Sequence, residues 1–164
     1  MSISQRFRNL YIRSEAVGSG SCITTGTTAL SYDADDKETF TKVVSFEQDT
    51  GMASFILNVM YKTNTGEVDV KIVKTVIYSC IGDLAARFTE LGHIENLEDY
   101  DIIFQERMPA EDDDGNLKHE VYARINYKGT SSTIDFDGKL YYTIMVFNSP
   151  ASNMRLLLPG DGTT

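Results

Sequence analysis

The chain has 164 residues, which is the length of one domain with its own buried core. Hydrophobic residues make up 41% of the chain and aromatic residues 10%, and this content argues against disorder over most of the length. Its 24 acidic residues against 15 basic ones give a net charge of −9, which argues against nucleic-acid binding, because that affinity comes from neutralised phosphates. No apolar run approaches the roughly 18 residues of a membrane span, and the N-terminus lacks a signal peptide, so we expect cytoplasmic synthesis and no membrane partner.

The chain begins with a predicted amphipathic helix. In ISQRFRNLYIR, residues 3–13, the apolar Ile3, Phe7 and Leu10 recur at helical spacing. The arginines of this stretch are Arg6, Arg8 and Arg13. A basic segment on an acidic chain would be attracted to an acidic surface, such as that of a second copy.

A stretch rich in glycine, serine and threonine follows, EAVGSGSCITTGTTALSYD at residues 15–33. It fails as a phosphate-binding P-loop, because Thr27 stands where the motif requires lysine. Cys22 has no basic neighbour in the sequence that would activate its thiol. We expect one strand within it, at residues 23–32, and interpret residues 1–38 as an N-terminal arm that adapts to a partner.

Three strands are predicted next, TFTKVVSFE, SFILNVMYK and EVDVKIVK. Apolar and polar residues alternate along the second and third, which indicates one buried and one mixed face. The connections contain Gly51 and Gly66, and glycine accepts the positive φ of tight turns without penalty. We therefore expect an antiparallel meander.

A helix is predicted between Val76 and Leu91, because apolar residues recur there at three- and four-residue steps. These residues are Ile77, Cys80, Ile81, Leu84, Phe88 and Leu91. Gly92 would end the helix, and Cys80 would be a small buried hydrophobic residue on its apolar stripe.

Four more strands are predicted in the C-terminal half, YDIIFQERM, HEVYARINYK, SSTIDF and KLYYTIMVFN. Asp-Gly pairs between the first two and between the last two indicate hairpins. The predicted fold is thus α+β, with a mainly antiparallel sheet of about seven strands and one central packed helix. Both a sandwich and a small barrel around that helix remain as possible forms of the sheet. The body would span residues 39–148, and residues 149–164 would form a C-terminal tail.

No catalytic, cofactor-binding or metal-binding residue is predicted. A zinc site of the usual cysteine and histidine ligands would have to join Cys22, Cys80, His93 and His119 from four distant segments. The acidic run AEDDDGNLKHE lacks the first and last ligands of a calcium-binding EF-hand loop, and a solvated hairpin tip explains it better. Tyrosines and phenylalanines of the last strands could stack on single-stranded nucleic acid, but the acidic charge favours core packing and subunit contact.

The sequence therefore predicts a non-enzymatic structural subunit that assembles with copies of itself and with other assembly proteins. A phage tail, neck or capsid-decoration component, incorporated into a virion, would fit this description. The predicted subunit contacts are Ile3, Arg6, Phe7, Arg8, Arg13, Leu156 and Leu157. The alternative is a small acidic binding or inhibitor module that engages a basic protein partner.

Overall fold

Nine β-strands make up the part of the chain that the computed structural model describes, which comprises residues 22–48, 52–66, 68–81, 86–107, 117–130, 133–146 and 155–157. No helix occurs within these ranges. The strands are β1 (Cys22–Tyr32), β2 (Thr41–Gln48), β3 (Met52–Thr65), β4 (Lys71–Ile81), β5 (Arg87–Glu95), β6 (Tyr100–Arg107), β7 (Leu117–Tyr127), β8 (Phe136–Val146) and β9 (Arg155–Leu157). The architecture of this part is all-β.

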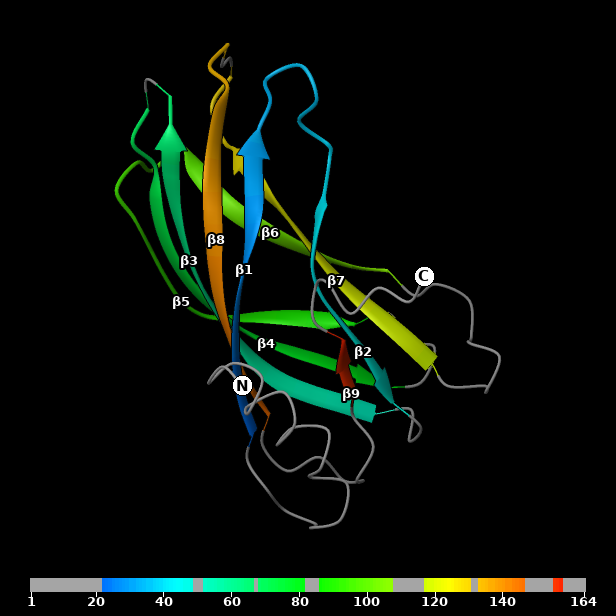
Figure 1. The fold of residues 1–164 in the computed structure, drawn as a ribbon. Helices are drawn as coiled ribbons and strands as arrows, with labels where there is room; N and C mark the ends of the chain where they lie inside the picture. Colours follow the sequence, from blue (N-terminus) through cyan, green and yellow to red (C-terminus); the bar gives the residue numbers. More distant parts are fainter. Residues whose placement is uncertain are drawn as a thin grey trace, which may run out of the picture.

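The strands form two antiparallel sheets that pack on each other (Figure 1). One sheet has five strands in the order β1-β8-β3-β4-β5, and the other has four in the order β6-β7-β2-β9. Aromatic rings join the inner faces, as where Phe46 of β2 meets Phe55 of β3 edge-on at a centroid distance of 5.4 Å. Phe88 of β5 likewise stacks on Phe104 of β6 at 5.7 Å. The core therefore lies between the sheets, as in a β-sandwich.

Strict alternation decides which side chains enter this core. Along β8, for example, every second residue from Phe136 to Val146 is buried, and the residues between them are exposed or half-buried. This is the two-residue period of a strand with one face against a core. The hydrophobic effect of burying these faces is the main force that holds the sheets together.

The predicted central helix is wrong. Its residues lie in β4, in β5 and between them, and the two strands pair antiparallel with Tyr78 opposite Phe88. Residues Ile72, Val76 and Tyr78 of β4 are buried, while Val73 and Ile77 lie on the other face. Because both faces carry apolar side chains, spacings of three and four residues arise without a helix. The β-branched and aromatic residues of KTVIY favour a strand.

The last predicted hairpin is also wrong, because Asp137 and Gly138 lie inside β8 instead of in a turn. Residues 133–135 of the predicted strand SSTIDF are irregular, and its final residue, Phe136, begins β8. The other predicted strands each overlap an observed one, and Gly66 has the expected positive φ, 126°, in the β3–β4 connection. The turns at Gly51 and Gly115 lie outside the described residues.

Both predicted arms contribute an edge strand. β1 falls within residues 1–38 and pairs along its whole length with β8, from Cys22 opposite Val146 to Tyr32 opposite Phe136. β9 falls within residues 149–164 and pairs with β2. The predicted helix at residues 3–13 lies outside the described part of the chain.

Candidate functional site

The outer face of the five-stranded sheet carries a row of exposed apolar side chains, one from each of four adjacent strands. The strand register places Tyr141 of β8, Met60 of β3, Val73 of β4 and Ile94 of β5 side by side across the sheet. Their exposed fractions are 41%, 50%, 42% and 74%, in that order. Thr27 of β1 continues the row beyond Tyr141.

The next two rows of the same face are also uncharged. One contains Thr25, Thr143, Asn58, Thr75 and Gly92, and the other contains Ile23, Met145, Ile56, Ile77 and Thr89. The Asn58 amide donates a hydrogen bond to the Thr75 hydroxyl at 2.7 Å. These two polar side chains therefore bond to each other within the sheet. We call these three rows the uncharged face.

A row of lysines borders the uncharged face. Lys139 of β8 lies opposite Lys62 of β3, which lies opposite Lys71 of β4, and all three are exposed. Lys71 pairs with Asp69 at 2.6 Å. The uncharged face is thus flanked by positive charge on a chain whose net charge is −9.

The outer face of the other sheet is different in kind. Lys42 of β2 pairs with Glu120 of β7 at 3.2 Å, and Arg124 of β7 pairs with Glu38 at 3.1 Å. The Arg107 guanidinium lies 4.3 Å from the centroid of the Tyr122 ring. Charged and amphipathic side chains at these positions are typical of a face that meets water.

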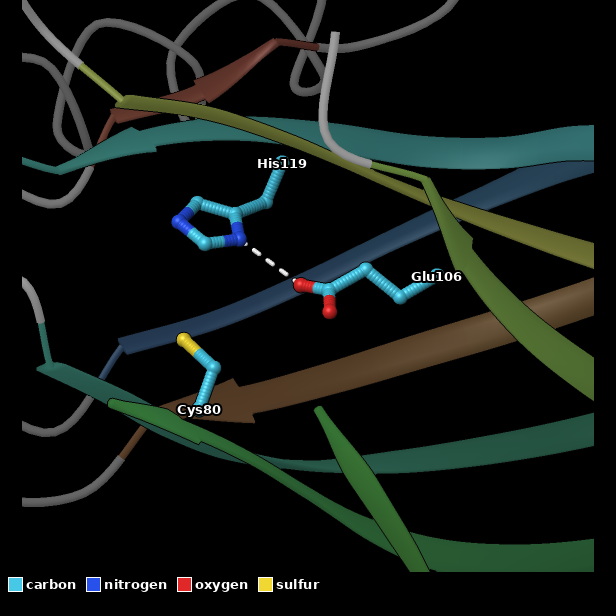
Figure 2. Close-up of side chains that lie close together, drawn as sticks. All are labelled: Cys80, Glu106 and His119. Atoms are coloured by element: carbon cyan, nitrogen blue, oxygen red, sulfur yellow. Dashed lines mark hydrogen bonds and ion pairs between the residues drawn. The ribbon is translucent and has the colours of Figure 1, made fainter. Parts of the chain in front are cut away.

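A second candidate site is a cluster of chemically reactive side chains between the two sheets. Figure 2 shows Cys80 of β4, Glu106 of β6 and His119 of β7 pointing toward one another. One potential ligand atom from each residue lies within 4.8 Å of the other two. We call these three residues the buried cluster. His119 is 0% exposed and Cys80 is 4% exposed.

The Glu106 carboxylate is the centre of the hydrogen bonds in the buried cluster. Nδ1 of His119 lies 2.7 Å from Oε1 of Glu106, and Oε2 accepts a hydrogen bond of 2.9 Å from the Ala86 amide. The Tyr78 hydroxyl also donates to Oε1 and contacts the thiol of Cys80. Burial by itself would raise the pKa of Glu106, but the hydrogen bonds from His119, Tyr78 and Ala86 outweigh it and hold the pKa below its usual 4.5.

Neighbouring aromatic rings hold the buried cluster in place. The His119 imidazole stacks on Phe46 at a centroid distance of 5.0 Å and an angle of 5°. The Tyr78 ring stacks on Phe55 at 4.6 Å. Burial raises the pKa of the Tyr78 hydroxyl, and its hydrogen bonds to Cys80 and Glu106 raise it further, so it stays a protonated donor.

A third polar group surrounds the buried ammonium of Lys74 on β4. Its Nζ lies 3.0 Å from a carboxylate oxygen of Asp101 and 3.0 Å from one of Glu90, and it donates to the backbone oxygen of Ile102 at 3.0 Å. Three oxygen partners compensate the burial of the charge. The arrangement ties β4 to β5 and β6.

The residues predicted as subunit contacts are not brought together in the described part of the chain. Leu156 and Leu157 lie in β9, where their backbones pair with Phe46 and Ser45 of β2. The others, Ile3, Arg6, Phe7, Arg8 and Arg13, lie outside the described residues. Of the histidines, His119 joins the buried cluster, whereas His93 lies on β5, 3.2 Å from Glu95.

Sequence reasoning missed Glu106, because a chain with 24 acidic residues offers no way to choose one without geometry. A signal was nevertheless present. Glu106 continues the inward alternation of Tyr100, Ile102 and Phe104 along β6, and His119 continues that of Val121 and Ala123 along β7. A charged or titratable residue at a core position of a strand indicates a partner across the core.

Comparison with known proteins gives one distant likeness in structure. No family model and no curated protein sequence matches the chain. Among solved structures, the tailspike protein of Acinetobacter baumannii phage AM24 aligns with a TM-score of 0.46 and 9% sequence identity. The alignment covers 84% of this chain and 28% of the tailspike chain. A similarity at this level supports neither a shared fold family nor a shared function.

No helix in the described ranges is long and apolar enough to cross a membrane.

Proposed function

We propose that this protein is a non-enzymatic assembly subunit that binds further copies of itself through the uncharged face. The observation that carries the proposal is the row of Tyr141, Met60, Val73 and Ile94, all at least 41% exposed and contiguous across four strands. Contiguous apolar patches on a protein surface mark interaction sites, because covering them removes apolar area from water.

Charge favours a second copy as the partner. The lysine row of Lys62, Lys71 and Lys139 would be attracted to an acidic surface on another copy. The connection between β1 and β2 exposes such a surface, with Asp33, Asp35, Asp36 and Glu38. Attraction between these opposite charges would orient one copy on the next.

If the lysine row of one copy meets the acidic connection of the next without the reverse contact, the contact is head-to-tail, and such contacts build rings or filaments. Rings and filaments are the forms that a phage tail or neck component would take, so we extend the proposal to a virion component.

The proposal is tested by light scattering on the full-length chain over a concentration series. We expect a mass above 18.3 kDa that rises with concentration, and a monomer for the double variant V73E/I94E, because burying two new carboxylates is costly. The matched control is Gln105→Glu, which adds a carboxylate at an exposed position of the other sheet and should leave the mass unchanged.

A monomeric wild-type chain at every concentration would contradict self-assembly, as would a double variant that associates like the wild type. A monomer that forms a salt-sensitive complex with a basic protein would instead support the acidic binding module.

A further inference from the structure

We propose that Cys80, Glu106 and His119 bind one Zn²⁺ ion between the two sheets. The three side chains come from β4, β6 and β7 and direct their donor atoms into one place, with every pair of these atoms within 4.8 Å (Figure 2). This site is independent of the uncharged face, which lies on the opposite side of the five-stranded sheet.

The types of ligand select the metal. A thiolate, an imidazole nitrogen and a carboxylate oxygen are the three donors that zinc uses in proteins, whereas calcium and magnesium prefer oxygen alone. The thiol and the imidazole are the softer donors and favour a transition metal over these hard cations. Among the common cellular ions, the set fits zinc.

The distances are close to those of a bound site. Donor atoms on a tetrahedral zinc ion are separated by roughly 3.3–3.8 Å, as follows from metal–ligand bonds of about 2.0–2.3 Å. The buried cluster has Nδ1 and Oε1 at 2.7 Å, and every separation is at most 4.8 Å. The ion would replace the His119–Glu106 hydrogen bond. It would also displace the Tyr78 hydroxyl, which bonds to Oε1 of Glu106, contacts the Cys80 thiol and lies 3.4 Å from Nδ1 of His119. Small movements of these side chains therefore suffice.

Neighbouring groups are arranged to support the ligands. The Ala86 amide donates to Oε2 of Glu106 at 2.9 Å and leaves Oε1 on the side of His119. The Phe46 ring fixes the plane of the imidazole by stacking on it at 5.0 Å. Such outer contacts orient the ligands of metal sites and strengthen binding.

Burial assigns the ion a structural role. His119 is 0% exposed and Cys80 is 4% exposed, so a substrate has no access to them in the folded chain. The ion would join β4 of one sheet to β6 and β7 of the other, across the core. Because the unfolded chain does not hold the three ligands together, zinc binding would add to the stability of the fold.

The experiment uses the full-length chain, stripped with EDTA, desalted and titrated with Zn²⁺ against a chromogenic chelator. A parallel titration with Co²⁺ is followed by absorption, because a near-ultraviolet charge-transfer band reports a thiolate bound to cobalt. We expect one equivalent of each metal, the thiolate band, and a midpoint of thermal unfolding that rises by roughly 5–10 °C when Zn²⁺ is 100-fold above its Kd.

Two serine variants form a matched pair. Cys80→Ser should remove the thiolate band and weaken zinc binding by at least roughly 10-fold. Cys22→Ser should leave both unchanged, because Cys22 lies on β1, which β8 and β3 separate from β4. Equal zinc affinity in the two variants would overturn the proposal, as would a Co²⁺ spectrum without the thiolate band.

A measurement on the wild type decides the matter even if a variant fails to fold. Alkylation of the buried Cys80 proceeds through transient opening of the core. Zinc at about ten times its Kd should slow this reaction roughly tenfold, since only the metal-free fraction reacts, and mass spectrometry of the peptides separates Cys80 from Cys22. An alkylation rate of Cys80 that zinc leaves unchanged refutes the site.

Discussion

At the scale of single residues, a tyrosine of the five-stranded sheet lies across its neighbour strand and leaves room only for glycine there. The Tyr61 hydroxyl of β3 passes over Gly138 of β8 and donates a hydrogen bond to the backbone oxygen of Leu30 on β1 at 3.0 Å. A Cβ atom on Gly138 would lie 2.0 Å from that hydroxyl oxygen. This glycine is therefore required by the close approach of a side chain.

Replacing Gly138 by alanine should destabilise the protein by about 1–3 kcal/mol, because the Tyr61 ring must move and give up its hydrogen bond. Urea unfolding followed by tyrosine fluorescence measures the change. Gly92→Ala is the matched control, since no atom lies within 4 Å of a Cβ at that position of β5. Its stability should change by less than about 0.5 kcal/mol. Equal effects of the two substitutions would contradict the close contact.

Glu106 is expected to make stability depend on acid pH. Its pKa in the folded protein is lower than the usual 4.5, so the stabilisation that it provides is complete above the unfolded-state pKa. This stabilisation is lost as the pH falls through the folded-state pKa. Glu106→Gln should be less stable than the wild type by about 2 kcal/mol at pH 7, and the difference should shrink below about pH 4.

Urea unfolding between pH 3 and pH 7, with EDTA present, tests this expectation. Glu98→Gln, at an exposed position in the connection between β5 and β6, is the control and should follow the wild type throughout. A constant difference between E106Q and the wild type over this pH range would show that the ionised carboxylate is not the source of the stability.

At the scale of elements, β4 connects the two sheets through polar side chains. Its inward face carries Lys74 and Tyr78, which bond to Asp101 and Glu106 of β6. Its outward face carries Val73 and other residues of the uncharged face. An element with apolar residues on both faces has no clear two-residue period, which is why the sequence pattern favoured a helix there.

Replacing Lys74 by methionine should destabilise the protein by about 2 kcal/mol, because Asp101 is only 16% exposed and would lose its cation. The half-exposed Glu90 would be rehydrated and moderates the effect. Thermal and urea unfolding measure the difference. The control is Lys62→Met on the adjacent strand β3, where the lysine is exposed and a change within about 0.5 kcal/mol is expected. Equal losses in the two variants would contradict the bridging role of Lys74.

At the scale of the whole molecule, the two outer faces of the sandwich are unlike each other. The four-stranded sheet shows ion pairs to solvent, whereas the five-stranded sheet shows three rows without a charge and a row of lysines beside them. Such asymmetry gives the molecule a direction, as a head-to-tail assembly requires. The light-scattering comparison of V73E/I94E with Q105E tests this asymmetry, because both add carboxylates to exposed strands and differ in the face that they alter.

Much of the strand content could be predicted from the sequence. Alternation in SFILNVMYK located β3, and the glycine of TNTG located the turn that follows it. The strand expected at residues 23–32 matches β1. These features are local, because the period of side chains along one strand does not depend on which strand lies beside it.

The buried cluster and the uncharged face could not be predicted from patterns along the sequence. The cysteine and histidine of the buried cluster are 39 positions apart in the sequence. Glu106 is one of 24 acidic residues, and its residue type alone does not distinguish it from the others. The uncharged face escaped notice for the same reason, since its rows run across five strands and each strand contributes only one residue to a row.

By itself, the sequence determined that this chain folds around a substantial core, that alternating segments form antiparallel strands and that the surface is acidic, because composition and local period suffice for these. Only the tertiary structure decided that Val76 to Leu91 is two strands and a connection, that Cys80 meets His119 and Glu106, and that three adjacent rows of one sheet face carry no charge. Strand order and register place residues distant in the chain side by side, and both depend on how all the strands pack together.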